Sequence, residues 1–146
     1  MTQNLITVPM GTSLFEAHEL MKEKRIRHLP VLDSKDELVG IISQRDLQYV
    51  PGSKAIPVEL MMSSPVHFVS EATPLRQAIF LMLQKKISCL LIADADDNAI
   101  GIITTDDLLW HLSHLLAEEE EDRPFLSSQA RQSIGEVAKE LAQMGI

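Results

Sequence analysis

Two copies of a seven-residue phrase carry the residues of this chain that are best suited to chemistry. Residues 40–46 read Gly-Ile-Ile-Ser-Gln-Arg-Asp, and residues 101–107 read Gly-Ile-Ile-Thr-Thr-Asp-Asp. The glycine allows close approach to the backbone, and the β-branched pair favours a strand. Ser43 and Thr104 are then expected at the start of a helix, where unpaired backbone N–H groups attract anions. The aspartate that ends each copy is predicted to share this position.

The same spacing has a purely structural interpretation. Ser43 with Asp46, and Thr104 with Asp107, form the pattern Ser/Thr-x-x-Asp. This pattern resembles a capping box, which stabilises a helix start by about 1 kcal/mol without any ligand. The spacing alone favours capping. A carboxylate can also accept two hydrogen bonds from the hydroxyls of a ribose, so a binding role stays open.

The phrase belongs to an internal repeat in which each residue of the second unit lies 61 positions after its counterpart. The offset holds without a gap over most of the chain. Aligned pairs include Val8 with Val69, Leu14 with Leu75, Ala17 with Ala78, Met21 with Met82, and Leu29 with Leu90. Two similar units that each bury one face are expected to pack against each other.

Composition is that of an ordinary globular protein. The chain has 146 residues, enough for one module with a shared core. Its net charge is −8, and residues 118–122 supply five of the acidic charges, so nothing suggests binding of nucleic acid. Cys89 is the only cysteine, which excludes an intrachain disulfide. With neither a signal-peptide pattern nor an apolar run of roughly 18 residues, we expect a cytoplasmic protein or fragment without membrane insertion.

Apolar periodicity and turn residues predict the order β-α-β-β-α for the first unit. We expect strands over residues 5–8, 26–32 and 38–42, a helix from the caps Thr12 and Ser13 to about Lys24, and a helix over 43–50. Pro30, inside the second strand, indicates an edge position or a locally unpaired backbone. Residues 51–65 read as a break and a connector.

The second unit repeats this order. We expect strands over residues 66–69, 87–92 and 99–103, and a last helix from 104 to about 116. A helix is predicted up to about Lys85, with Thr73 as cap and Pro74 at the first helical position. The acidic run is expected to be solvated. Residues 127–144 then read as an amphipathic helix whose apolar stripe is Ile134, Val137, Ala138, Leu141 and Met144.

These motifs, in this order and twice over, resemble the CBS domain, a family named after cystathionine β-synthase. The first unit reads Thr-Val at 7–8, Thr-x-Leu-x-x-Ala at 12–17, Ile-Arg-His-Leu-Pro-Val-Leu-Asp at 26–33, and Leu-Val-Gly-Ile-Ile-Ser-x-x-Asp-Leu at 38–47. Two such units in tandem resemble a CBS pair, or Bateman module. The resemblance covers about residues 1–116 and leaves out the tail.

The resemblance implies an α+β fold (α/β in some schemes) with two β-α-β-β-α repeats about a pseudo-twofold axis and a C-terminal helix. We divide the chain into repeat 1 (1–52), connector and repeat 2 (53–117), and acidic linker with tail helix (118–146). Family members typically bind adenine nucleotides in two clefts and regulate an attached or partner enzyme, channel or transporter. They are rarely enzymes themselves.

By the same resemblance, two sites combine the strand of one unit with the aspartate of the other. The first would hold Thr7, Ile26, Arg27, His28, Thr104 and Asp107, and the second Phe68, Ile87, Ser88, Cys89, Ser43 and Asp46. The aspartates would hold the ribose, and Ser43 and Thr104 would lie near ribose or phosphate. The strand segments would line the adenine slot, with Arg27 and His28 available to neutralise phosphate.

The second unit departs from the family pattern at two positions. Leu91 stands where the first unit has Pro30, and Phe68 stands where it has the hydroxyl of Thr7. Met1-Thr2 aligns with Met62-Ser63, so the first unit lacks a counterpart of residues 56–61; we expect a chain that begins inside a longer protein, or a shortened first unit.

Three functions remain in view. The first is a regulatory module that is not an enzyme, senses AMP, ADP or ATP, needs no cofactor, forms a homodimer, and acts on an unknown effector protein or missing domain. The second is a structural dimerisation module with empty clefts. The third is a metal-dependent enzyme using His111, His114 and Glu118, which share a helical face; such a trio is more commonly a plain surface. The methionines Met21, Met82, Met61 and Met62 read as core filling, and Cys89 shows no partners for a nucleophilic role.

Overall fold

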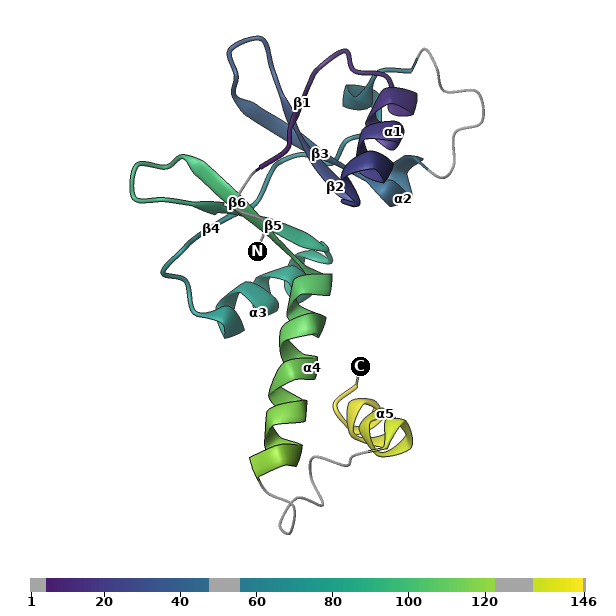
Figure 1. Cartoon of the computed structure of the whole chain (residues 1–146), viewed down its shortest axis with the longest axis vertical. Helices are drawn as coiled ribbons and strands as arrows, with labels where there is room; N and C mark the ends of the chain where they lie inside the picture. The colour runs from purple at the N-terminus through teal and green to yellow at the C-terminus, as the bar shows by residue number, and fades with distance from the viewer. Residues whose placement is uncertain (1–4, 48–55, 123–132, 146) are drawn as a thin grey trace. The chain divides into compact units, whose positions relative to one another are not determined.

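The computed structural model describes residues 5–47, 56–122 and 133–145 (Figure 1). The chain forms two compact units, residues 1–104 and 105–146. The first unit holds β1 (Val8–Pro9), α1 (Leu14–Lys24), β2 (His28–Leu32), β3 (Leu38–Ser43), α2 (Gln44–Leu47), the 3-10 turn η1 (Val58–Leu60), β4 (Phe68–Ser70), α3 (Leu75–Lys85), β5 (Cys89–Ala93) and β6 (Ala99–Thr104). With α4 (Thr105–Asp122) after β6, both repeats follow the predicted β-α-β-β-α order.

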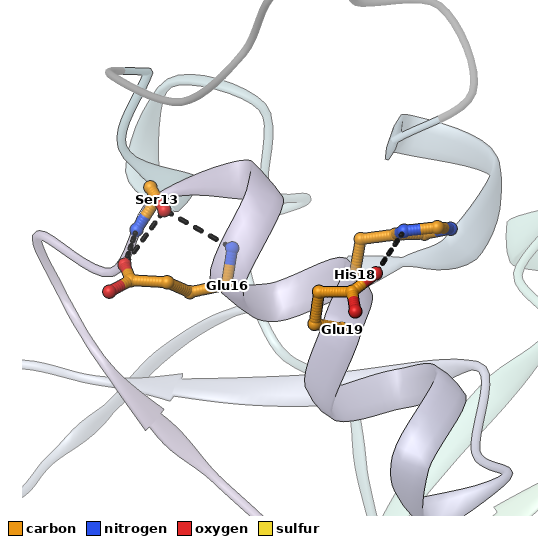
Figure 2. Close-up of polar contacts among 4 residues, drawn as sticks. All are labelled: Ser13, Glu16, His18 and Glu19. Atoms are coloured by element: carbon orange, nitrogen blue, oxygen red, sulfur yellow. Dashed lines mark hydrogen bonds and ion pairs between the residues drawn. The ribbon is translucent and has the colours of Figure 1, made fainter.

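Helix α1 begins and ends where its sequence predicts. Ser13 is the N-cap, and its hydroxyl oxygen accepts from the backbone N–H of Glu16 at 3.1 Å (Figure 2). The Glu16 carboxylate in turn accepts from the backbone N–H of Ser13 at 2.9 Å, which completes a capping box. These bonds lower the pKa of Glu16. The helix ends at Arg25, whose left-handed backbone turns the chain into β2.

Each repeat forms one three-stranded sheet, β1-β2-β3 and β4-β5-β6. In each sheet the first strand pairs in parallel with the central strand, and the central and third strands form an antiparallel hairpin. The expected edge position of Pro30 is wrong, because β2 is the central strand. The alternative of an unpaired backbone is correct, since the parallel pairing of β2 begins only at Val31, opposite Val8. Proline is tolerated there because its missing N–H would face the unpaired side.

Two clusters of buried side chains pack together among the described residues, and Ala78, Met82, Leu90 and Ile92 of repeat 2 are buried as well. The first lies within repeat 1 and joins α1, its sheet and Val58 from η1; it comprises Val8, Leu14, Ala17, Met21, Leu29, Val31, Ile42 and Val58. The second joins the two sheets, because Ile41 of β3 packs with Cys89 and Leu91 of β5 and Ile102 of β6. The predicted shared core between the repeats is therefore present.

The connector between the repeats packs on repeat 1. Its position in the sequence, directly before repeat 2, did not predict this. Its residues 56–63 are called the covering segment below. The N–H of Leu14 donates to the carbonyl of Ile56, and Ile41 exchanges two backbone hydrogen bonds with Ser63. Met62 lies so close to Gly40 that a Cβ atom there would meet its Cγ at 2.7 Å. A glycine at this position of the repeated phrase thus has a packing reason.

Helix α3 corrects one expected cap. Its N-cap is Pro74, with an extended backbone and no side-chain cap, and not Thr73. The carbonyl of Pro74 accepts from the N–H groups of Gln77 and Ala78, while the N–H of Thr73 donates to Ser70 in the preceding turn. Proline fits the N-cap because its fixed backbone is extended here and no N–H is needed.

The second unit contains α4 and α5 (Ile134–Gln143). Helix α4 runs to Asp122, beyond the expected end near residue 116 and through the acidic run. Helix α5 follows the N-cap Ser133, and its apolar stripe is exposed. The part of the predicted helix over residues 127–132 lies outside the described residues. Several predicted features lie outside the described residues: the end of the predicted first-repeat helix (48–50), the break at 51–55, residues 1–4 and Pro124. No helix in the described part of the chain is long and apolar enough to cross a membrane.

Candidate functional site

The antiparallel hairpin of repeat 1 brings predicted site residues together. In the register of β2 and β3, His28 lies directly opposite Ser43. The carbonyl of Arg27 accepts from the N–H of Gln44 at 2.9 Å, so the pairing continues into the first residue of α2. The start of the predicted adenine strand and the hydroxyl of the repeated phrase therefore face each other within one repeat.

The carboxylate of Asp46 is held against Ser43. Its Oδ2 atom accepts from the backbone N–H of Ser43 at 2.7 Å and from the Ser43 hydroxyl at 2.6 Å. Both residues are half-buried. This is the contact expected from the capping interpretation, so Asp46 stabilises the start of α2 in the absence of any ligand. Because both bonds use Oδ2, the carboxylate is also fixed in one orientation.

One hydrogen bond connects the two repeats at this place. The Nε2 atom of His28 lies 2.9 Å from the hydroxyl oxygen of Ser88, which directly precedes β5. His28 was assigned to the first predicted site and Ser88 to the second. The structure thus places members of both predicted sets in contact at the junction of the repeats.

The surroundings of His28 favour the neutral form of its imidazole by lowering its pKa. Burial lowers its pKa most, the neighbouring Arg27 and Arg45 lower it further, and Asp46 acts in the opposite direction. A neutral ring offers one donor and one acceptor rather than a positive charge. His28 therefore contributes a hydrogen bond to this junction, and Arg27, whose side chain is exposed, is the cation beside it. Arg45 occupies a variable position of the phrase and was not singled out from the sequence.

The second repeat shows the same register. Cys89 lies opposite Thr104, the last residue of β6, and α4 begins at the next residue. Asp107 lies in the first turn of α4, in the second compact unit. Burial raises the pKa of the Cys89 thiol to about 11, so it stays protonated and packs as a small apolar side chain.

The remaining predicted residues flank the sheets. Thr7 precedes β1, and Phe68 begins β4 opposite Leu91 with an exposed ring. Ile26 and Ile87 each donate their backbone N–H to the preceding helix, at Met21 and Met82 respectively. These amides therefore close the ends of α1 and α3. The division of all twelve residues into two sites stays a prediction.

The alternative metal site receives no support from the described side chains. No three His, Cys, Asp or Glu residues group there as ligands. His114 directs its Nδ1 atom to the carbonyl of Trp110 at 2.9 Å, and its ring lies 4.8 Å from the indole. The side chain of Glu118 is outside the described part.

Comparison with known proteins agrees with the repeat. A family model described as the CBS domain matches residues 1–51 and 58–114. Homoserine O-acetyltransferase of Methanohalobium evestigatum is 32% identical over 108 residues, which are 74% of this chain and 22% of that protein. Inosine-5'-monophosphate dehydrogenase of Korarchaeum cryptofilum is 31% identical over 120 residues, 82% of this chain and 25% of that protein. The chain thus spans about a quarter of the length of these curated relatives.

A solved structure extends the match to three dimensions. The CBS domain pair of protein MJ0100, in complex with 5'-methylthioadenosine and S-adenosyl-L-methionine, superposes with a TM-score of 0.71 at 25% identity. The match covers 79% of this chain and 93% of that one. Two sheets of the same topology, a repeat of the same phrase and a family match over both repeats lead to one conclusion: this chain belongs to the CBS domain family and carries two CBS repeats in tandem.

Proposed function

We propose that this chain is a ligand-sensing regulatory module that binds an adenosine-containing small molecule, expected among AMP, ADP and ATP. The observation that carries the proposal is the complex of the similar MJ0100 pair with two adenosine derivatives. The match to that pair covers 79% of this chain and 93% of that one, and we propose the junction of the repeats as the binding region of this chain. The module itself is proposed to be non-catalytic and to act on a partner protein or an attached domain.

The proposed contacts follow the residues of the repeated phrase and its facing strand. Asp46 and Asp107 would hold ribose hydroxyls, with Ser43 and Thr104 beside ribose or phosphate. In repeat 1, the fixed Oδ2 of Asp46 is used by Ser43, so a ribose would share this carboxylate through its other oxygen or displace the serine hydroxyl. A ribose hydroxyl and the Ser43 hydroxyl would both make charge-assisted bonds here, because the acceptor is a carboxylate.

Regulation would act through the junction of the repeats. The bond between His28 and Ser88 joins the repeats beside the proposed site. A ligand shifts an equilibrium only as far as its affinities for the two states differ. A ligand that contacts both repeats would favour whichever arrangement of His28 and Ser88 it binds better. The resulting change in the arrangement of the repeats would be the signal to a partner protein.

The test is a ligand panel measured on the full chain. AMP, ADP, ATP, 5'-methylthioadenosine and S-adenosyl-L-methionine would be added separately, and thermal unfolding would be followed. A ligand that binds only the native state, at about 100 times its Kd, stabilises by roughly 2.7 kcal/mol. We expect at least one compound to raise the midpoint, and guanosine counterparts to raise it less. If none of the five compounds shifts unfolding or gives heat in calorimetry, the sensor proposal is wrong.

A structural dimerisation module is the second candidate. It is favoured by the bond between Ser43 and Asp46, which gives the phrase a role without ligand, and by exposed apolar residues on α4 such as Leu109 and Trp110. Symmetric dimers are the commonest oligomers. A homodimer by light scattering without any response to the panel would support this candidate. A monomer at all concentrations would oppose it, and a shorter chain without residues 123–146 would show whether the tail takes part.

A further inference from the structure

Helices α1 and α3 hold equivalent places in the two repeats, and their buried residues correspond: Ala17 and Met21 in α1, Ala78 and Met82 in α3. Three other positions within about one helical turn differ in character. They are His18, Glu19 and Lys22 in α1, and Ile79, Phe80 and Leu83 in α3. All three are exposed in α1, and α3 leaves 64% of Phe80 and 72% of Leu83 exposed. Equivalent helix positions are therefore polar in repeat 1 and apolar in repeat 2.

The three apolar residues of α3 form one patch, called the α3 patch below. Leu83 follows Ile79 by four residues and Phe80 by three, and these are the spacings of neighbours on a helix surface. The polar counterparts in α1 show that the fold of a repeat does not require apolar residues at these positions. Contiguous exposed apolar residues with an aromatic ring among them are typical of contact surfaces between proteins.

Helix α4 exposes a second apolar surface, called the α4 stripe below. It comprises Leu109, Leu112, Leu115 and Leu116, which are between 44% and 64% exposed. Leu112 lies three residues from Leu109 and Leu115 and four from Leu116, so the four side chains share one face of the helix. The chain thus presents two apolar helix surfaces, one on α3 and one on α4.

These two helices carry charges of opposite sign. The charged residues of α3 are Arg76 and Lys85, and Lys86 follows as its C-cap. Helix α4 has no lysine or arginine, and its acids are Asp106, Asp107 and the run at 118–122. Each helix has the same sign at both ends, so α3 and α4 are complementary whether they pack parallel or antiparallel. Two copies of α3, or two copies of α4, would instead bring like charges together.

We propose that the α3 patch of one chain packs on the α4 stripe of a second copy. In a twofold-symmetric dimer this contact forms twice, because each copy offers both surfaces to the other. The occupant is a second copy because this chain itself holds two apolar surfaces of opposite charge. Helix α1 takes no part, since it is polar at the positions of the α3 patch. The contact would form the homodimer expected above, on which the proposal rests, and it does not depend on nucleotide binding.

The first experiment gives α3 the residues of α1. The double variant Phe80→Glu, Leu83→Lys introduces the residue types of Glu19 and Lys22 at exposed positions. Sedimentation equilibrium of the full chain should show the Kd of the dimer raised about tenfold or more. The matched control is Phe15→Arg, which replaces a 45% exposed phenylalanine of α1 with the residue type of its repeat counterpart. It should change the Kd less than about twofold. Circular dichroism of each variant would confirm that it is folded.

A charge-reversal cycle then tests whether α3 meets α4 of the second copy. Arg76→Glu combined with Lys85→Glu reverses the sign of α3, and Asp106→Lys reverses one position of α4. Each change alone should weaken the dimer, and the combined chain should dimerise more tightly than the sum of the separate effects indicates. Asp96→Lys makes the same charge change in the exposed turn between β5 and β6, and it should give no such recovery.

A wild-type chain that stays monomeric at every concentration would overturn this contact, while the sensor proposal would still be decided by the ligand panel. A dimer whose Kd is unchanged in Phe80→Glu, Leu83→Lys would exclude the α3 patch. Equal weakening by Phe15→Arg would place the interface on α1 as well and would contradict its restriction to repeat 2. Purely additive effects in the charge-reversal cycle would show that another surface covers the α3 patch.

Discussion

The backbone N–H of Leu91 donates to the carbonyl oxygen of His67 over 3.0 Å. The repeat-related pair in the first sheet is Pro30 and Ile6, and proline has no N–H to donate. The parallel pairing in the second sheet accordingly runs over Phe68–Ser70, whereas in the first sheet it covers only Val8–Pro9. A single missing donor explains why two units with one sequence pattern differ in the length of this strand.

Replacing Leu91 with proline should transfer that defect to the second sheet. Leu91→Ala alone is expected to cost about 2–5 kcal/mol, because the Leu91 side chain is completely buried. Leu91→Pro should cost about 1–3 kcal/mol more than Leu91→Ala, since the carbonyl of His67 loses its partner. Urea denaturation of both variants measures the difference. Equal stabilities would mean that this hydrogen bond contributes nothing.

The contact between Gly40 and Met62 gives a second prediction. A Cβ atom on residue 40 would lie 2.7 Å from Cγ and 3.1 Å from Cε of Met62, and closer still to its sulfur. Gly40→Ala should therefore destabilise the chain by about 1–3 kcal/mol through overpacking. Met62→Ala removes the obstruction, so the double variant should be more stable than the sum of the two single effects indicates.

The control for this cycle is Gly11→Ala, because no atom lies within 4 Å of a Cβ at that position. Its cost should come only from the positive φ of 87° and should be unaffected by Met62→Ala. Additive effects of Gly40→Ala and Met62→Ala would show that the methionine moves away freely and that the glycine has no packing role.

Local patterns in the sequence predicted most of the fold. The capping box of Ser13 and Glu16, the end of α1 at Lys24 and the end of α3 at Lys85 are all determined by residues within one turn of the feature. The covering segment could not be predicted in this way. It precedes repeat 2 in the sequence but packs on repeat 1, and only tertiary contacts such as that between Ile56 and Leu14 decide the matter.

The site was predictable in its parts but not in its contacts. The bond from Ser43 to Asp46 follows from their spacing, and the structure shows it. The bond between His28 and Ser88 joins residues 60 positions apart and has no local signal. The lowered pKa of His28 comes first from burial and then from Arg27, with a smaller effect of Arg45, which stood at a variable position of the phrase. The pattern of residue types therefore identified the candidate site residues, whereas the pKa of His28 depends on long-range packing.

The lowered pKa of His28 predicts a dependence of stability on pH. The unfolded chain holds a proton on this imidazole at a higher pH than the folded chain does, so protonation favours unfolding. The contribution of His28 should therefore decrease as the pH falls below the ordinary histidine pKa of about 6.5, and level off below the folded-state pKa. Urea denaturation between pH 5 and 8 would measure this on the wild-type chain and on His28→Gln.

The contribution of His28, measured as the stability of the wild-type chain minus that of His28→Gln, should decrease as the pH falls from 8 to 5. His18→Gln is the matched control, because His18 is exposed on α1 and lies 3.7 Å from Glu19. If His28→Gln and wild type follow parallel curves from pH 8 to pH 5, the His28 ring is not held neutral by its surroundings.

The last prediction is an asymmetry between the two proposed clefts. We expect the cleft assigned to Asp107 to bind nucleotide more tightly than the cleft assigned to Asp46. The first set includes the hydroxyl of Thr7 and the cation of Arg27, whereas the second has Phe68 and Ser88 at the same repeat positions. A hydrogen bond to a charged group is worth roughly 1.5–3 kcal/mol and a neutral one about 1. One such difference amounts to about tenfold in affinity.

Calorimetry on Asp107→Ala and Asp46→Ala separates the two clefts. Asp107→Ala should remove the tighter binding event, and Asp46→Ala should leave it largely intact. Asp96→Ala, an exposed acid in the turn between β5 and β6, controls for the loss of one negative charge. Because Asp46 also accepts two bonds from Ser43, the stability of its variant must be measured in parallel. A greater loss of affinity in Asp46→Ala than in Asp107→Ala would mean that the cleft assigned to Asp46 binds more tightly. Stacking of Phe68 on adenine would have this effect. Unchanged binding in both variants would show that the aspartates act only as helix caps.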